Sequence, residues 1–252
     1  LRQQKAKLLG FKTFADYAID PVMAKTVDAA ENLLLSIWKP AVKKVDEEVA
    51  DMQKYADAHG AGYKIEAWDY YYFAEKVKAE KYNFSEDDVR PYFKLENVVE
   101  NGLFFLANKL YGLTFTKMPK APKYNPEVTV YDVKDAKGKH VAVFMTDYYP
   151  RPVKAQGAWM MEMNQAYDFG GKSERPIVYN VCSFTAPTKD IPSLLTLDEV
   201  QTAFHEFGHA LNGMLTVAPY KGLEGTNIDR DFVELPSQLN EHWALVPEVL
   251  KN

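Results

Sequence analysis

The sequence predicts a mainly α-helical protein with a small antiparallel or mixed β-sheet between two helical regions. Three observations support this fold class. Apolar residues recur at helical spacing through most of residues 1–115, residues 127–149 alternate apolar and polar side chains, and residues 192–215 return to helical spacing. With 252 residues, 47% of them hydrophobic, the chain can bury a full core.

The N-terminal part of the chain is expected to be helical. After short amphipathic pieces, residues 21–60 form one long segment that Gly60 and Gly62 end. Pro40 should bend or break this helix, because proline lacks the backbone N–H that a helix interior uses. Further helices are expected at residues 63–83, 85–93 and 98–113. We therefore assign residues 1–120 to a helical region.

The middle of the chain has the pattern of a small sheet. Residues 127–149 alternate on either side of Asp135 to Gly138, which predicts a hairpin with its turn at these residues. The apolar run from Pro176 to Phe184 predicts another strand, and we expect the single cysteine within it to be a buried structural thiol. Residues 121–252 are the second expected region, in which this sheet is joined to the helices that follow it.

Composition excludes several classes of partner. A net charge of −5, with Lys and Arg spread along the chain, gives no attraction to nucleic acid. No stretch approaches the roughly 18 uninterrupted apolar residues of a membrane span, and the N-terminus lacks the apolar core of a signal peptide. A single cysteine fits a reducing compartment, and we expect a cytoplasmic location. We also expect a monomer in the full-length form, without nucleic-acid or membrane partners.

Residues 204–212, FHEFGHALN, contain the pattern His-Glu-x-x-His in the middle of a predicted helix that a capping box at Thr196 and Glu199 begins. His205 and His209 are four residues apart, so they project from one side of the helix and can bind one metal ion. Glu206 can reach a water on that metal without being a ligand. The alternative is a surface helix that carries these residues by chance, which we estimate at about one chain in a hundred at this length.

A catalytic zinc ion needs a third protein ligand and an open position for water. The candidates lie downstream, at Glu224, Glu234, Glu241 and His242. Glu224 lies in a loop that contains glycines, whereas Glu234 and Glu241 share a polar stripe on a segment with helical spacing. Spacing alone does not decide among the four.

Two runs, HEFGHAL and GLEGTNIDRDFVELPSQLNEHW, resemble the thimet oligopeptidase family of zinc metallopeptidases, and most closely its bacterial peptidyl-dipeptidase branch. Upstream, DYYPRPVKAQGAW and VYNVCSFTAP resemble signatures that the family has in its sheet. The likeness covers most of the chain, although residues 1–120 match chiefly in helical character. Asn212 departs from the pattern, since many members have His there, at a position that is not a metal ligand.

The resemblance implies a zincin-like core with Zn²⁺ as cofactor, His205, His209 and Glu234 as zinc ligands, and Glu206 as general base. It implies hydrolysis of short peptides, with release of C-terminal dipeptides. Alternatives are internal cleavage by an oligopeptidase of the same family, or a zincin that binds peptides without cutting them. A helical interaction module with a structural metal is a further alternative, but such a site does not need the glutamate beside the first histidine.

Family members are longer than this chain, and a later helical segment supplies Tyr and His side chains that bind substrate. We therefore expect the 252 residues to be part of a catalytic domain. The strand near residues 178–184 is the expected sheet edge for an extended peptide. Asp231 and Ser237 are candidates to support the ligating imidazoles. Arg151 and Lys154 are expected either to be solvated or to bind a substrate carboxylate.

Overall fold

The computed structural model describes residues 1–83, 85–220 and 222–252. They form a mainly helical protein with a small mixed sheet, which confirms the predicted fold class at this level. The chain divides into two compact units, Leu1–Asp88 and Val89–Asn252. The helices between residues 89 and 111 thus belong to the same unit as the sheet. The domain boundary expected after residue 120 stays a prediction.

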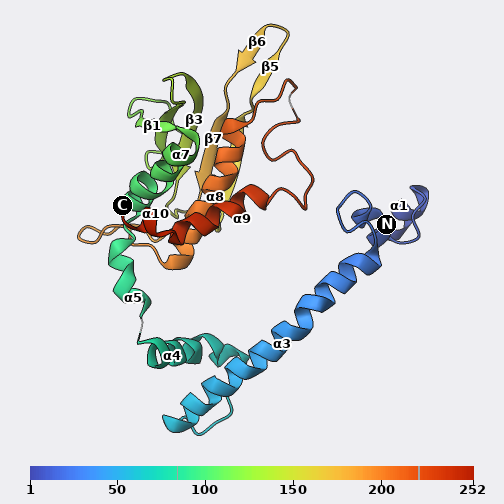
Figure 1. Cartoon of the computed structure of the whole chain (residues 1–252), viewed down its shortest axis with the longest axis vertical. Helices are drawn as coiled ribbons and strands as arrows, with labels where there is room; N and C mark the ends of the chain where they lie inside the picture. Colours follow the sequence, from blue (N-terminus) through green and yellow to red (C-terminus); the bar gives the residue numbers. More distant parts are fainter. Residues whose placement is uncertain (84, 221) are drawn as a thin grey trace. The chain divides into compact units, whose positions relative to one another are not determined.

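The first unit is built around one long helix (Figure 1). Thr26 begins this helix, because its side chain accepts a hydrogen bond from the N–H of Ala29. Pro40 lies inside the helix, which continues through it, so of the two expected outcomes, a bend or a break, the break does not occur. The elements are α1 (Arg2–Leu8), α2 (Phe14–Ile19), α3 (Val27–Ala58), a 3₁₀ turn (Ala67–Asp69) and α4 (Tyr70–Tyr82). Helices α3 and α4 pack around Met52, Ala56 and Phe73.

The second unit contains a five-stranded sheet in the order β1-β2-β3-β7-β4. Its strands are β1 (Thr114–Lys117), β2 (Thr129–Lys134), β3 (His140–Asp147), β7 (Ile177–Val181) and β4 (Trp159–Asn164). Strands β3 and β7 are parallel and the other three pairs are antiparallel, so the sheet is mixed. The β2–β3 hairpin turns at Asp135–Gly138, as predicted. Strands β5 (Tyr167–Phe169) and β6 (Lys172–Glu174) form a separate two-stranded hairpin.

The edge of this sheet is not where the sequence placed it. Strand β7, which lies in the expected edge segment, is paired on both sides, by β3 and by β4. The edge is β4, which the alternation pattern missed because its residues, WMMEMN, combine three methionines with one charge and show no simple apolar and polar alternation. A peptide that adds a strand at this end of the sheet would therefore pair with β4 and not with β7.

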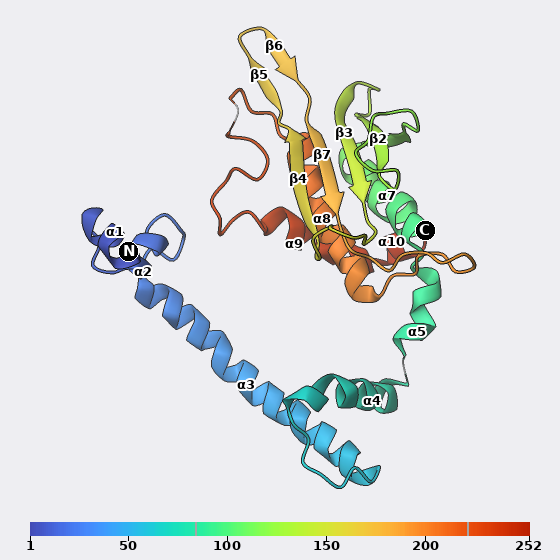
Figure 2. The same ribbon diagram turned by 180° about the vertical axis from the view of Figure 1, so that it is seen from behind.

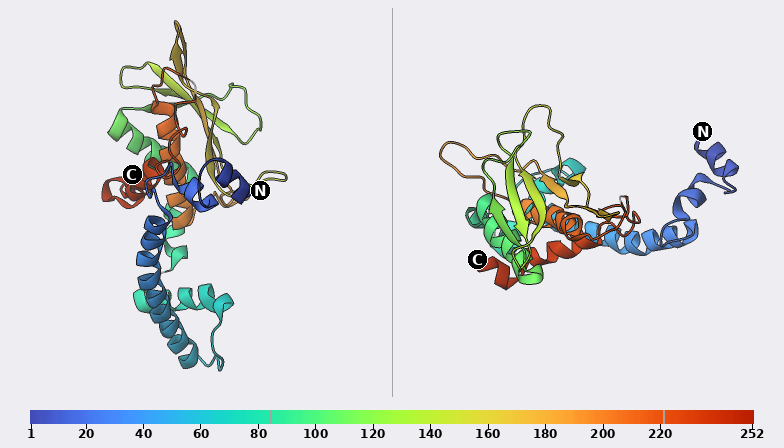
Figure 3. Two further views of the ribbon diagram at one scale, coloured as in Figure 1. Left: turned by 90° about the vertical axis from the view of Figure 1, so that its right-hand side faces the viewer. Right: turned by 90° about the horizontal axis from the view of Figure 1, so that it is seen from above.

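Two helices cover one face of the sheet. These are α7 (Phe104–Tyr111) and α8 (Leu197–Leu215). The ring of Phe207 on α8 lies 5.6 Å from that of Phe144 on β3, and the ring of Phe104 on α7 lies 6.1 Å from that of Phe207. Figures 1 and 2 show the two helices in front of the strands and then behind them, and the view from above places both on the same side (Figure 3). The burial of these aromatic side chains fixes how α8 lies on the sheet.

Shorter helices and turns complete the second unit. They are a 3₁₀ turn (Arg90–Tyr92), α6 (Leu95–Asn97), a π-helix (Val98–Leu103), α9 (Leu235–Glu241), a 3₁₀ turn (His242–Leu245) and α10 (Pro247–Leu250). Helix α5 (Glu86–Val89) spans the boundary between the two units. Helix α9 packs against α8. None of the helices in the described residues has the length and apolar character that crossing a membrane requires.

Candidate metal centre

Helix α8 carries the His-Glu-x-x-His motif and begins as predicted. The side chain of Thr196 accepts from the N–H of Glu199 at 3.1 Å, and Glu199 Oε2 accepts from the N–H of Thr196 at 2.9 Å, which confirms the capping box. One helical turn separates His205 from His209, and their ring centroids are 5.0 Å apart. His209 is buried and His205 is partly exposed, so the pair lies at the border between the buried and the exposed sides of the helix.

Three potential ligand atoms meet beside α8. Glu234, at the N-terminus of α9, places Oε2 at 3.2 Å from Nε2 of His205 and at 3.0 Å from Nε2 of His209. The ligand atoms of these three residues all lie within 4.8 Å of one another. The structure therefore brings together the two histidines of the motif and one of the four downstream candidates.

The other three candidates lie elsewhere. Oε2 of Glu224 is buried and accepts from the N–H of Leu223 at 2.6 Å. Oε1 of Glu241 is 2.6 Å from Nδ1 of His205, on the side of the ring away from Glu234. His242 is exposed in the 3₁₀ turn after α9. Among the residues that the structure describes, Glu234 is thus the candidate that faces both Nε2 atoms.

Glu241 fixes the hydrogen-bonding state of His205. A carboxylate can only accept a hydrogen bond, so the short contact assigns the ring proton to Nδ1 of His205. In a neutral ring with its proton on Nδ1, Nε2 has the free lone pair that binds a metal. Carboxylate partners of this kind orient the histidine ligands of metal sites and raise their basicity. The sequence left Glu241 open as one of four candidate ligands, and the structure places its carboxylate against Nδ1 of His205.

The carboxylate of Glu234 is held from its own helix. Ser237 Oγ donates to Oε2 of Glu234 at 2.8 Å and to its carbonyl oxygen at 3.0 Å. Burial raises the pKa of Glu234, but this bond and the two imidazoles outweigh burial, and the pKa is lowered from its usual value. Ser237 therefore supports the carboxylate rather than an imidazole, contrary to expectation. Asp231, the other residue expected in that role, is exposed.

Glu206 has a different environment from Glu234. It is 6% exposed, and one carboxylate oxygen, Oε2, has no hydrogen-bond partner among the described atoms. Burial raises its pKa to about 7, and the charge of Glu234 adds to this, although His205 lowers it. Burial also lowers the pKa of His209, which favours the neutral imidazole. A buried carboxyl group with one unpartnered oxygen, within electrostatic reach of His205 and Glu234, is suited to accept and release a proton.

The arrangement fits a zinc ion. If Nδ1 of His205 carries the proton, its Nε2 and Oε2 of Glu234 are two acceptors that face each other at 3.2 Å. Such a contact is repulsive unless a proton or a metal cation lies between the atoms. Two imidazole nitrogens and one carboxylate oxygen are a donor set that catalytic zinc sites use, with the fourth position open.

Gly208, inside the motif, permits the close approach of α9. A Cβ atom at this position would lie 2.7 Å from the carbonyl oxygen of Pro236 and 2.7 Å from Cα of Ser237. Both are backbone atoms, so a side chain could fit only if α9 moved. Since α9 begins directly after Glu234, the glycine lets the carboxylate reach the histidines. The sequence pattern gave no role to this residue, because the constraint comes from a partner 28 positions later.

The basic residues before β4 form a structural network. Arg151 donates two hydrogen bonds to the carboxylate of Asp147, at 2.6 and 2.8 Å, and Lys154 donates to the same carboxylate at 3.0 Å. Lys154 also donates to the carbonyl oxygens of Tyr149 and Cys182, both at 2.6 Å. Lys154 is buried, so the expected roles, a solvated cation or a substrate contact, were wrong for it. Cys182 is buried, as predicted, and burial raises the pKa of its thiol.

Comparison with known proteins decides the family. The model of peptidase family M3 matches residues 1–252. The chain belongs to peptidase family M3. This confirms the resemblance that the motifs indicated.

Relatives in peptidase family M3 include enzymes with two kinds of name. Dipeptidyl carboxypeptidase of Salmonella typhimurium is 42% identical over 251 residues, which are 100% of this chain and 37% of the relative. Oligopeptidase A of the same organism is 35% identical over 252 residues, covering 99% of this chain and 37% of the relative. Probable cytosolic oligopeptidase A of Arabidopsis thaliana is 40% identical over 257 residues, covering 97% of this chain and 36% of the relative. The chain thus spans just over a third of the length of these curated relatives.

Proposed function

We propose that this chain carries the catalytic centre of a zincin-like, zinc-dependent peptidase that hydrolyses short peptides and releases C-terminal dipeptides. The observation that supports this most is the convergence of His205, His209 and Glu234 on one point, with Glu206 buried beside it. Membership of peptidase family M3 supports peptide hydrolysis, and the name of the dipeptidyl carboxypeptidase relatives supports the dipeptide product. The proposal refers to the whole protein of which these residues are the site.

In the proposed mechanism, Nε2 of His205, Nε2 of His209 and Oε2 of Glu234 would hold the metal. Zinc bound there would supply Lewis acidity toward the scissile carbonyl and a water molecule. Glu206 accepts a proton from the attacking water at its unpartnered Oε2 and then gives it to the leaving amine. Glu241 holds the ring of His205, and Ser237 holds the carboxylate of Glu234. No covalent bond between enzyme and substrate is needed.

The substrate is proposed to lie along β4. This strand is the edge of the sheet and it packs on α8, the helix that carries the motif. An extended peptide can add to such an edge through main-chain hydrogen bonds, which tolerate many side chains. That mode suits a peptidase with a broad range of short substrates.

A second candidate function is internal cleavage of oligopeptides. The oligopeptidase A relatives favour it, at 35% and 40% identity. The same metal and the same base would serve both reactions, so the difference lies in how the end of the substrate is held. A zincin that binds peptides without cutting them is a third candidate. We also propose a monomeric, cytoplasmic protein without nucleic-acid partners, with the Arabidopsis name in support of the location.

One experiment tests the proposal on the complete protein. Short peptides are incubated with the zinc-loaded enzyme, and the products are identified by mass spectrometry before and after removal of the metal by a chelator. We expect C-terminal dipeptides, loss of cleavage on chelation and recovery on adding zinc. Internal fragments would favour the oligopeptidase alternative, and zinc binding without products would favour a peptide-binding protein.

The ligand assignment is tested with histidine variants. His205→Ala and His209→Ala should each abolish stoichiometric zinc binding, because two remaining protein ligands hold the ion poorly. His140→Ala is the matched control, since this exposed histidine pairs with Asp132 on the sheet and should leave the zinc content unchanged. Full zinc occupancy in both motif variants would contradict the proposed site.

A further inference from the structure

Two buried asparagines donate hydrogen bonds to the backbone of α8 on either side of His205. Nδ2 of Asn180, on β7, is 2.7 Å from the carbonyl oxygen of Glu206. Nδ2 of Asn240, on α9, is 2.6 Å from the carbonyl oxygen of Phe204. Asn180 is 1% exposed and Asn240 is 5% exposed. Neither residue contributes a ligand atom to the metal centre, and the sequence gave no reason to select them.

These bonds are additional to those that form the helix. In an α-helix the carbonyls of residues 204 and 206 already accept from the N–H groups four positions later. Each carbonyl oxygen has a second lone pair, so it can accept an amide from outside the helix. Because a carbonyl can only accept, the NH₂ group of each asparagine must face α8, which fixes the orientation of both amides.

Packing alone does not explain an asparagine at position 180. Its other amide atom, Oδ1, is buried and has no hydrogen-bond partner among the described atoms. A buried polar atom without a partner is unfavourable, and each one in a native structure calls for an explanation. Position 180 lies on an interior strand, between Thr146 of β3 and Met160 of β4, where valine has about the right size and a higher strand propensity. The asparagine is thus kept at a cost to the core.

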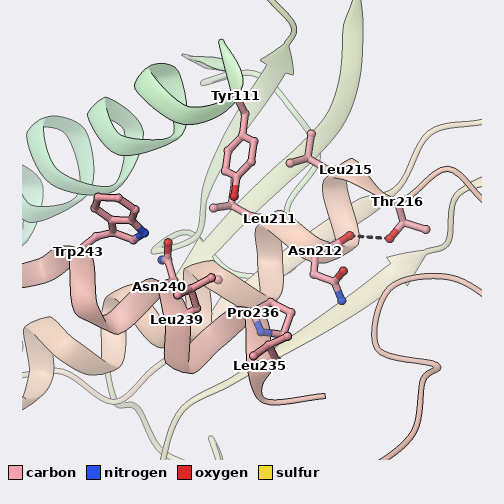
Figure 4. A pocket seen from close by; sticks show the side chains of 11 residues that line it. Tyr111, Leu211, Asn212, Leu215, Thr216, Leu235, Pro236, Leu239, Asn240 and Trp243 are labelled. Carbon is pink, nitrogen blue, oxygen red and sulfur yellow. Dashed lines mark hydrogen bonds between the residues drawn. The ribbon is translucent and has the colours of Figure 1, made fainter. Parts of the chain in front are cut away.

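The two bonds hold the helix from different directions. Successive residues of an α-helix are about 100° apart around its axis. All carbonyls of a helix run roughly along its axis, but those of residues 204 and 206 lie on nearly opposite sides of it. The carbonyl of Glu206 is held by Asn180 of the sheet, and that of Phe204 is held by Asn240 of α9, which packs against α8. Asn240 also forms part of the wall of a pocket at the α8–α9 contact, beside Leu211 and Trp243 (Figure 4). Van der Waals contacts alone let a helix slide or turn slightly, whereas two opposed hydrogen bonds do not.

We propose that Asn180 and Asn240 are positioning residues that lock α8 at the turn carrying His205 and Glu206. The lock sets the rotation of the helix between the sheet and α9, and thereby the distance from the imidazoles to Glu234. This inference rests on the proposed function, since the geometry matters only if the histidines bind a metal. Partners that orient metal ligands typically change metal affinity by 10- to 100-fold when they are removed.

The test uses two independent variants of the complete protein. Asn180→Val suits a strand and Asn240→Ala suits a helix, so each removes the amide with little other disturbance. Asn108→Ala is the matched control, because its amide donates to the carbonyl oxygen of Leu113 at 3.1 Å, at the end of α7, and not to the backbone of α8. Hydrogen exchange of the backbone amides of residues 204–210 is measured in the metal-free protein. Zinc affinity is then measured by titration.

We expect faster exchange at these amides, by about tenfold, and zinc affinity weaker by about tenfold in both variants but not in the control. The thermal unfolding midpoint of Asn180→Val should change little, because the unpaired Oδ1 is removed with the amide. Unchanged exchange in both variants would overturn the lock. Faster exchange with unchanged zinc affinity would also overturn it, because the lock would then not act on the site. A wild-type protein that binds no zinc would instead refute the proposed function, while exchange still decides whether α8 is locked.

Discussion

Two glutamates near the motif histidines have opposite electrostatic environments. Burial raises the pKa of Glu206, whereas the hydrogen bond from Ser237 and the two imidazoles more than offset burial at Glu234 and lower its pKa. Carboxyl groups whose environments separate their pKa values in this way commonly have separate roles. The environments agree with Glu234 as a permanently ionised ligand and Glu206 as the group that exchanges a proton.

The proposed division of roles predicts different outcomes for two similar variants. Glu206→Gln should keep zinc bound while hydrolysis falls by about 10²- to 10⁴-fold, because an amide cannot accept the proton of water. Glu234→Gln should weaken zinc binding itself, because a neutral amide is a poorer ligand than a carboxylate. Metal analysis and peptide turnover on the same preparations distinguish the two. Equal loss of zinc in both variants would show that the roles are wrongly divided.

At the level of single residues, the sequence predicted the two histidines and the adjacent glutamate as a group because one helix period relates them. It left Glu224, Glu234, Glu241 and His242 open as the third ligand. Glu234 and Glu241 lie on one polar stripe, and which of them faces Nε2 depends on how α9 packs against α8. That packing is a tertiary property, and the residue that permits it, Gly208, has no signal of its own in a periodic pattern.

At the level of elements, the contact between α8 and α9 predicts that Gly208→Ala is harmful although alanine favours helices. The helix propensity gained is about 1 kcal/mol, whereas a Cβ atom 2.7 Å from two backbone atoms forces α9 to shift, and overpacking of this kind costs about 1–3 kcal/mol. Unfolding in urea should show a net loss of stability of about 1 kcal/mol. Zinc affinity should fall as well, because Glu234 moves with α9.

Gly102→Ala is the matched control for this substitution. A Cβ atom at Gly102 would lie 3.5 Å from the ring of Phe204, an ordinary contact, so the stability should stay the same or rise by up to about 1 kcal/mol. If Gly208→Ala kept full stability and full zinc affinity, the close approach of the two helices would not be what positions Glu234.

The ion pairs of Asp147, the last residue of β3, with Arg151 and Lys154 predict that Asp147→Asn lowers the stability strongly. Asp147 is 2% exposed and Lys154 is buried with it, so the neutral amide leaves a buried cation without its charge partner. Breaking a buried pair in this way costs about 3–5 kcal/mol. Asp132→Asn is the control, because its pair with His140 is partly exposed and should contribute less than about 1 kcal/mol. Urea unfolding at pH 7 measures both.

The stability lost in Asp147→Asn should depend on pH in a way that follows from the shifted pKa of Asp147. Burial alone raises the pKa of Asp147, but the bonds from Arg151, Lys154 and Tyr124 outweigh it, so the folded pKa lies below 3.8. A lowered folded pKa stabilises the protein above the unfolded value, and this stability is lost as the pH falls through the folded pKa. The loss of stability in Asp147→Asn should therefore be the same at pH 7 and pH 5. If the stability difference between wild type and Asp147→Asn were much smaller at pH 5 than at pH 7, the pKa of Asp147 would not be lowered as described.

Elements were predictable where one strong local signal existed. The capping box fixed the start of α8, and the turn at residues 135–138 fixed the β2–β3 hairpin. Strand β4 was missed because its pattern is mixed, and this error moved the expected sheet edge to β7. Pro40 was expected to bend or break its helix, yet α3 continues through it. Local patterns give no information on strand order, which long-range pairing decides.

At the level of the whole molecule, the match to peptidase family M3 extends over every residue, while the chain spans just over a third of the length of its relatives. The proposed ligands, base and positioning residues all lie within one of the two compact units, Val89–Asn252. This unit has a core of its own, formed by α7, α8 and one face of the sheet.

We propose that one zinc ion is held by two imidazoles and one carboxylate on α8 and α9. The most direct measurement is an anomalous difference map, collected at the zinc absorption edge from crystals of the complete protein. We expect one strong peak at about 2.0–2.2 Å from Nε2 of His205, Nε2 of His209 and a carboxylate oxygen of Glu234, with Glu206 and Glu241 outside bonding distance. A map without a peak at this point, or a peak bonded to Glu224 or Glu241 in place of Glu234, would contradict the proposal.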